Sequence, residues 1–287
     1  FWLTGRVLAF STTGKITEVE DERDCDLDGA RTAIGTFGGM LAGTSPIELA
    51  TLVSKAALER SGVEGAQIGQ VAFGHVINTE PKDMYLSRVA ALQAGVSETT
   101  AAMNVNRLCG SGAQAIVSVI QSLMLGDADF GLAGGAENMS RSPFILQDQR
   151  WGAKMGDVRT LDMMLGALNC PFGTGHMGVT AENVAAEHDV SRAEQDAFAM
   201  TSQTRAAAAI RDGRFEDQIT PVSVKVKRDK VDFICDEHPK QTDEAALAGL
   251  RPVFQKDGSV TAGNASGIND GAAALVLAQA SAAQMAG

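Results

Sequence analysis

The 287-residue sequence predicts an α/β fold, a sheet covered by helices, with an inserted segment of different character. Across residues 29–139, short apolar runs with strand character alternate with longer runs whose apolar residues recur at helical spacing. The 31 glycines fit many tight turns between such elements. An apolar segment at 260–278 then returns to the style of the first part.

The first part contains six predicted elements. In chain order they are a helix at 46–60, a buried strand at 71–77, a helix at 86–95, an extended run before Cys109, a helix after Cys109 and a small-residue strand at 131–136. Residues 1–28 differ from all of these because they form an acidic leader. A block of this kind remains solvated, so we expect the leader to be poorly ordered.

Residues 140–256 are predicted to form an inserted subdomain. Ser191 and Glu194 have the spacing of a capping box, which predicts a long helix from there to about Arg211. Residues 222–227 alternate between apolar and polar side chains, which indicates a half-exposed strand. Residues 231–234 are its expected hairpin partner across 228–230.

Composition and charge exclude several classes of function. A net charge of −11 argues against a nucleic-acid surface, which needs a basic patch. No apolar run approaches the roughly 20 residues that span a bilayer, and no secretory leader is recognisable at Phe1. The four cysteines are far apart, which fits neither a zinc site nor a disulfide scaffold. We therefore expect a cytoplasmic protein with no metal, nucleic-acid partner or membrane partner.

The segment from Asn104 to Gly112 carries the most informative residue, Cys109. Apolar side chains at helical spacing follow it, so Cys109 is predicted to lie just before a helix N-terminus. The helix dipole and free backbone N–H groups favour a negative charge there, and the thiolate is the form of cysteine that attacks. Gly110 and Gly112 leave space beside the sulfur for an electrophile or another backbone segment.

Two other interpretations of this segment remain open from the residues alone. Cys109 could be a buried structural thiol, the usual state of a free cysteine. Residues 110–115 also match the G-x-G-x-x-A form of a dinucleotide-binding turn. The polar run at 103–107 disfavours that second interpretation, because such a turn follows a strongly apolar strand.

Four separated segments together resemble the thiolase family. Asn106–Gly112 with Gly134–Ser140 is similar to the acyl-enzyme region of thiolases, and Gly175–Gly178 with Thr180–Asn183 to their substrate loop. Val260–Ala272 is similar to a further thiolase signature, and Ala30–Gly35 to the family's opening motif. The resemblance implies a thiolase-like layered α/β/α fold. Residues 29–139, completed by about 257–287, would form the N-terminal α/β domain, and 140–256 the CoA-binding loop subdomain.

The resemblance implies an acyltransferase that makes or cleaves a carbon–carbon bond in β-ketoacyl-CoA. Cys109 would accept the acyl group as a thioester, which divides a Claisen condensation into two easier steps. Its backbone N–H would contribute to an oxyanion hole. No metal or redox cofactor would be needed, because coenzyme A thioesters are the substrates. The His176-Met177 pair is similar to that of short-chain, biosynthetic β-ketothiolases.

The resemblance also implies which residues bind the acyl-CoA and how the chain assembles. Seven positions match substrate-binding positions of the family: Leu168, His176, Met177, Lys240, Phe254, Ala262 and Ser266. Lys240 falls near a basic residue that meets the adenine and phosphate end of CoA. The family implies a homodimer or a homotetramer.

Some parts of the family pattern are not found in this sequence. Complete thiolases have a second α/β half with a Gly-His-Pro histidine and a second, Cys-x-Gly cysteine, and neither motif occurs here. We therefore expect the C-terminal half to be largely absent and this polypeptide alone to show no acetoacetyl-CoA thiolysis. The alternative function is a catalytically incompetent thiolase fragment with residual acyl-CoA or partner binding.

Overall fold

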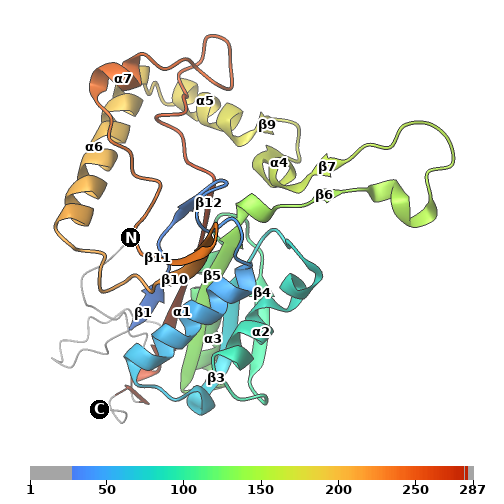
Figure 1. The fold of residues 1–287 in the computed structure, drawn as a ribbon, viewed down its shortest axis with the longest axis vertical. Coiled ribbons are helices and arrows are strands. Elements are labelled where there is room, and N and C mark those ends of the chain that lie inside the picture. Colours follow the sequence, from blue (N-terminus) through green and yellow to red (C-terminus); the bar gives the residue numbers. More distant parts are fainter. Residues whose placement is uncertain (1–27, 281, 284–287) are drawn as a thin grey trace.

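A computed structural model describes residues 28–280 and 282–283 of the chain. The acidic leader predicted for residues 1–28 lies outside the described residues, apart from Asp28. One sheet with helices against it forms the larger part of the molecule, and a second group of helices lies beyond one end of its strands (Figure 1). The predicted α/β class is confirmed.

The sheet is mixed, with strand order β1-β12-β5-β3-β4. Strand β3 is parallel to both β4 and β5, whereas β12 is antiparallel to β5 and to β1. The C-terminal ends of β3, β4 and β5 therefore share one edge of the sheet with the start of β12. The strands are β1 (Gly29–Arg31), β2 (Gly35–Thr36, paired with β12), β3 (Ile68–Gly74), β4 (Ala101–Val105), β5 (Phe130–Asn138) and β12 (Asn269–Ala278).

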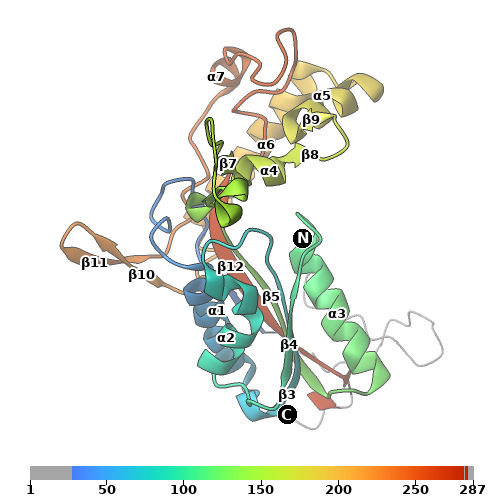
Figure 2. The same cartoon turned by 90° about the vertical axis from the view of Figure 1, so that its right-hand side faces the viewer.

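Helices cover both faces of this sheet. Helices α1 (Pro46–Ser61) and α2 (Leu86–Gln93) lie on one face and α3 (Ser111–Leu125) on the other (Figure 2). Two buried clusters correspond to the two faces, one containing most of the buried side chains of α1 and α2 and the other those of α3. All three helices appear at their predicted places.

The expectation that no segment is long and apolar enough to cross a membrane fails at helix α3. Residues 108–125 pass that test by length and composition, with a mean hydropathy of 1.5. Ala115, Val119 and Leu123 are buried against the sheet, so α3 packs as one layer of this fold. Composition alone does not separate such a helix from a membrane span.

The inserted segment, residues 140–256, places most of its elements beyond the end of the sheet (Figure 1), but Val222, Val224 and Phe233 belong to the buried cluster that contains α1. Its long helix α6 (Arg192–Arg211) and the Ser191–Glu194 capping box are both confirmed. The predicted hairpin is also confirmed, with a shorter turn between β10 (Val222–Val226) and β11 (Asp229–Phe233). The other elements are β6 (Phe144–Ile145), β7 (Leu161–Asp162), α4 (Met163–Leu168), β8 (Asn169–Cys170), β9 (Gly175–His176), α5 (Met177–Glu187) and α7 (Glu244–Ala248). Short 3₁₀ turns occupy Gly65–Gln67, Pro81–Tyr85, Met139–Arg141 and Gln147–Trp151.

The strand predicted at 71–77 is displaced by three residues, because β3 ends at Gly74. The backbone N–H groups of Val76 and Ile77 donate to the carboxylate of Glu137, at 2.9 and 3.1 Å, instead of to a neighbouring strand. The Glu137 carboxylate thus accepts the hydrogen bonds that a neighbouring strand would otherwise accept. The apolar residues after β3 line a pocket rather than the sheet interior.

Candidate active site

Cys109 lies in the turn between β4 and α3, as the sequence predicts. The helix begins at Ser111, Gly110 is its N-cap residue, and Cys109 is exposed. The thiol therefore lies beside the first turn of α3, where backbone N–H groups point away from the helix. Exposure excludes the interpretation of Cys109 as a buried structural thiol.

The turn that carries Cys109 is held in an unusual backbone conformation. Leu108 has a φ of 48°, in the left-handed region that side chains other than glycine rarely adopt. The buried hydroxyl of Ser111 donates to the Leu108 carbonyl at 2.6 Å and accepts from the Arg107 N–H at 2.8 Å. The Asn106 side chain accepts from the Leu108 N–H at 3.1 Å. Two side chains thus fix the turn.

A pocket of about 430 Å³ opens beside Cys109. It lies where β3 and β5 end and β12 begins, which is the shared edge of the sheet. Leu168, from α4 of the inserted segment, also lines it, so the structure brings together Cys109 and one of the residues predicted to bind the acyl group. Small residues form much of the wall near the thiol: Gly74, Gly112, Gly135, Ala136, Ala272 and Ala273.

One glycine in this wall is required by packing. A Cβ at Gly74 would lie 2.5 Å from the Ser111 carbonyl carbon and 2.6 Å from the Gly112 nitrogen. At Gly112 a Cβ would meet nothing within 4 Å. Gly112 therefore leaves open space beside Cys109, as predicted, whereas Gly74 lets the end of β3 approach the start of α3.

Two carboxyl groups line the pocket, and sequence reasoning missed both. Burial raises the pKa of Glu137. The hydrogen bonds that Glu137 accepts and the nearby His75, whose Nδ1 lies 3.6 Å from Oε1, act in the opposite direction but do not cancel the effect of burial. Burial also raises the pKa of Asp270, which is 1% exposed and accepts from the N–H and hydroxyl of Ser140 at 3.0 and 2.5 Å. The pocket therefore carries acidic groups whose ionised form is disfavoured.

His75 is a buried neighbour of this pocket with an unusual environment. Its Nδ1 lies 2.8 Å from the carbonyl oxygen of Ala136, so Nδ1 is the protonated nitrogen. Within the part of the chain that the structure describes, its Nε2 has no hydrogen-bond partner. The available sequence signal was a histidine inside the strand predicted at 71–77, but the burial of its side chain beside the pocket depends on the tertiary fold.

A second group of predicted residues gathers at the start of α5. His176 is the N-cap of this helix, and its Nδ1 accepts from the N–H of Gly178 at 3.0 Å. The His176 ring stacks on Phe254, and Met177 beside it is 40% exposed. Because His176 in β9 pairs with Asn169 in β8, the residue after Leu168, this group adjoins the Cys109 pocket through a two-stranded sheet.

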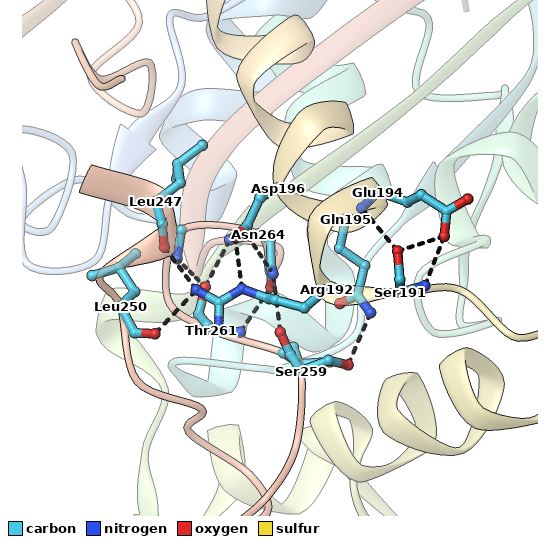
Figure 3. Close-up of polar contacts among 12 residues, drawn as sticks. Ser191, Arg192, Glu194, Gln195, Asp196, Leu247, Leu250, Ser259, Thr261 and Asn264 are labelled. Atoms are coloured by element: carbon cyan, nitrogen blue, oxygen red, sulfur yellow. Dashed lines mark hydrogen bonds and ion pairs between the residues drawn. The ribbon is translucent and has the colours of Figure 1, made fainter. Parts of the chain in front are cut away.

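Ala262 and Ser266 lie exposed on a loop that we call the 259–266 loop. Helices α5 and α6 hold its first part by side-chain contacts, and the contact from α6 is that of Gln195 with the Ser259 hydroxyl at 2.8 Å (Figure 3). The buried carboxylate of Glu182 on α5 accepts from the N–H groups of Ser259 and Val260, each at 2.8 Å, and from the Ser259 hydroxyl at 3.0 Å. Burial opposes ionisation of Glu182, but these hydrogen bonds hold its pKa below the usual range.

A network centred on Asp196 fixes the rest of the loop to α6 (Figure 3). Asp196 accepts from the Asn264 amide at 2.9 Å and pairs with Arg192 at 2.7 Å. Arg192 also donates to the carbonyls of Leu247 and Leu250, at the end of α7. Lys240 is exposed, and its backbone N–H donates to Gln203 of α6. The structure thus places Lys240 apart from the Cys109 pocket.

The fold and the site together define an α/β protein with an exposed thiol at a helix N-terminus, beside a pocket with a mainly small-residue and apolar wall. A family model for the thiolase N-terminal domain matches residues 27–281. The chain belongs to the thiolase family.

Individual relatives agree with this assignment. The chain is 54% identical over 263 residues to beta-ketothiolase BktB of Cupriavidus necator, a match that covers 91% of this chain and 67% of the relative. It is 45% identical over 260 residues to an acetyl-CoA acetyltransferase of Escherichia coli, covering 90% and 66%. The chain spans about two thirds of the length of these relatives.

Solved structures share the fold. The acetyl-CoA acetyltransferase of Bacillus anthracis superposes with a TM-score of 0.87 at 42% identity, covering 91% of this chain and 66% of that protein. Human mitochondrial 3-ketoacyl-CoA thiolase in complex with CoA gives a TM-score of 0.85 at 38% identity, covering 90% and 65%. The thiolase-like fold predicted from the sequence is therefore confirmed.

Proposed function

We propose that the chain carries the nucleophile of a thiolase acyltransferase, which catalyses the reversible Claisen condensation of two acyl-CoA molecules. Acetyl-CoA to acetoacetyl-CoA, or to another short β-ketoacyl-CoA, is the expected reaction. One observation carries the proposal: the exposed thiol of Cys109 lies at the start of α3 and lines a pocket together with Leu168.

The first chemical step is acyl transfer to sulfur. The Cys109 thiolate attacks the thioester carbonyl of acyl-CoA, the bond from that carbonyl to the sulfur of CoA breaks, and CoA leaves as a thiolate that takes up a proton. Backbone N–H groups in the turn at the start of α3 are suited to stabilise the oxyanion of the tetrahedral intermediate. The product is an acyl thioester of Cys109.

Most of the predicted acyl-CoA residues fall into two groups, one at the start of α5 and one on the 259–266 loop. His176, Met177 and Phe254 would line the pantetheine and acyl pocket, with Leu168 between them and Cys109. Ala262 and Ser266 would contact the pantetheine from the 259–266 loop, and Lys240 would meet the phosphate end. Their gathering on the inserted segment and the loop after it supports these roles.

A single-turnover experiment tests the proposal. The purified chain is incubated with acetyl-CoA, and intact-protein mass spectrometry with peptide mapping locates any acetyl group. We expect one acetyl group on Cys109 and none on Cys109→Ala, with Cys170→Ala and Cys235→Ala as matched controls that still become acylated. An acetyl group on Cys170 or Cys235 instead would refute the role of Cys109. Binding of CoA without acylation would favour the alternative, a non-catalytic acyl-CoA-binding protein.

The proposal extends to partners, cofactors and location. Acyl-CoA is the small-molecule partner, no metal or redox cofactor takes part, and the chain assembles as a homodimer or homotetramer in the cytoplasm. Acylation that persists in the presence of EDTA would support the absence of a metal. Light scattering would measure the oligomeric state.

A further inference from the structure

Three consecutive polar residues after β11, Asp236, Glu237 and His238, lie along the back of the Cys109 pocket. We call them the acidic strap. They belong to the inserted segment, yet their side chains contact residues 31–40 of the sheet domain and Asn269 at the start of β12. The contacts of Asp236 and Glu237 join residues about 200 positions apart in the chain.

Asp236 fixes the side chain of Arg31. The two carboxylate oxygens accept from Nη1 and Nη2 of Arg31 at 2.8 and 3.0 Å, and one of them also accepts from the Ile34 N–H at 2.7 Å. Within the described residues, the Arg31 side chain also contacts the Thr32 carbonyl, the Gln218 side chain and the ring of Phe215. Although Arg31 lines the pocket, its charge is thus neutralised by Asp236.

Glu237 holds the backbone of the next turn. Its carboxylate accepts from the N–H of Thr36 at 2.9 Å and from the N–H of Met40 at 3.2 Å. Its own N–H donates to the Ile34 carbonyl at 2.9 Å. Loss of the carboxylate would leave these N–H groups without this acceptor in a partly buried place, which is costly.

His238 completes the contacts on the far side. The amide of Asn269 donates to His238 Nδ1 at 3.2 Å and to the Gly35 carbonyl at 3.0 Å. Four residues that the strap touches or adjoins line the pocket with Cys109: Arg31, Ile34, Asn269 and Asp270. Burial is the main cause of the raised pKa of Asp270, and the negative charge of Glu237 raises that pKa further. The strap therefore acts on one wall of the pocket from behind.

We propose that Asp236 and Glu237 are positioning residues that set the part of the pocket wall around Arg31 and Ile34 and so determine how tightly acyl-CoA binds. This inference rests on the proposed acyl-transfer function. The strap would not touch the substrate itself. It would act by holding Arg31, Ile34 and Asn269, which line the pocket. The inserted segment thereby contributes to the pocket at a second place besides Leu168.

The test uses Asp236→Asn and Glu237→Gln, which keep the shape of the side chains and remove their charge. Single-turnover acylation of Cys109 is measured over a range of acetyl-CoA concentrations, beside the rate of Cys109 alkylation by iodoacetamide. We expect the half-saturating concentration to rise about tenfold, because small displacements of a binding wall cost binding strongly. The alkylation rate should stay within about twofold, because the small reagent does not need the wall.

Asp243→Asn is the matched control. Asp243 caps α7 through the Ala246 N–H at 2.7 Å and does not line the pocket. It should leave the half-saturating concentration unchanged. If the strap variants lower the melting temperature but leave that concentration unchanged, their role is structural and the proposal is wrong.

A second measurement separates this proposal from the acyl-transfer function. Hydrogen exchange of residues 31–40 and 268–271 should become faster in both strap variants and not in Asp243→Asn. If wild-type Cys109 is not acylated, the proposed function fails, and the exchange result still decides whether the strap orders the wall. Unchanged exchange at 268–271 would overturn the strap proposal.

Discussion

His176 and Phe254 stack with their ring centroids 4.9 Å apart and their planes inclined by 16°. The same histidine caps α5, because its Nδ1 accepts from the Gly178 N–H. A side chain at Gly178 would collide with the Phe254 ring, so the start of α5 packs closely on the segment after α7. One side chain therefore joins helix capping to the predicted acyl-CoA pocket.

Substitutions at His176 can separate these two roles. His176→Ala removes both the cap and the stacked ring, whereas His176→Asn supplies a good N-cap and removes only the ring. We expect Ala to lower the free energy of unfolding by about 1 kcal/mol more than Asn, as for other N-caps. Both should weaken acyl-CoA binding. Urea unfolding and half-saturation of Cys109 acylation measure the two effects.

Asp243→Ala is the control for His176, since it removes another side-chain cap on the inserted segment. It should lower stability without changing acylation. If His176→Asn keeps wild-type acylation, the ring of His176 does not serve the acyl-CoA pocket.

Ser111 is predicted to hold the nucleophile turn. Ser111→Ala leaves the Arg107 N–H without its acceptor and releases the Leu108 carbonyl, at a residue with φ of 48°. Arg107 is exposed, so only the net contribution of the hydrogen bonds is lost, and we expect stability to fall by about 1 kcal/mol. The acylation rate of Cys109 should fall as well. Ser118→Ala, on an outer turn of the same helix, is the control, and an equal effect of both variants would contradict the prediction.

Glu182 gives a prediction for pH. Its pKa in the folded chain is lowered by the hydrogen bonds from Ser259 and Val260, which outweigh burial. A depressed carboxyl pKa contributes stability that is fully present above the unfolded value of about 4.3 and is lost as pH falls through the folded value. Wild type should thus exceed Glu182→Gln in stability at pH 7, and the difference should shrink below about pH 4.

Urea unfolding of both proteins across this pH range measures the effect. Glu187→Gln is the control, because Glu187 lies exposed at the end of the same helix, α5, away from the contacts of Glu182 with the 259–266 loop. A stability difference for Glu182→Gln that is the same at every pH would contradict the prediction.

Features that depend on contacts between residues close in the sequence could be predicted, whereas features that depend on contacts between distant segments could not. The helices, the Ser191–Glu194 capping box and the place of Cys109 depend on contacts within a few residues, which appear as spacing and composition. The pairs Arg31–Asp236 and Glu137–Val76 depend on which segments the fold brings together, and the spacing of residues in the sequence does not predict them. The displaced end of β3 has the same origin, because a carboxylate from β5 replaces a strand partner.

Alanine substitutions at Gly74 and Gly112 can distinguish a glycine that the packing of the fold requires from a glycine that leaves room for the substrate. Gly74→Ala would press a methyl group onto the backbone at Ser111 and Gly112, so we expect a loss of about 1–3 kcal/mol in stability. Gly112→Ala adds its methyl to open space in the pocket and should leave stability unchanged or slightly raised, since alanine favours a helix by roughly 1 kcal/mol over glycine.

The same methyl at Gly112 would occupy the space that an acyl-CoA needs beside the thiol. Acylation of Cys109 in Gly112→Ala should therefore fall at least about tenfold, whereas alkylation by iodoacetamide should change little, because that reagent is small. Gly166→Ala is the control, since a Cβ there also meets nothing within 4 Å and Gly166 does not line the pocket. Normal acylation in Gly112→Ala would mean that the acyl group reaches Cys109 from another side of the turn.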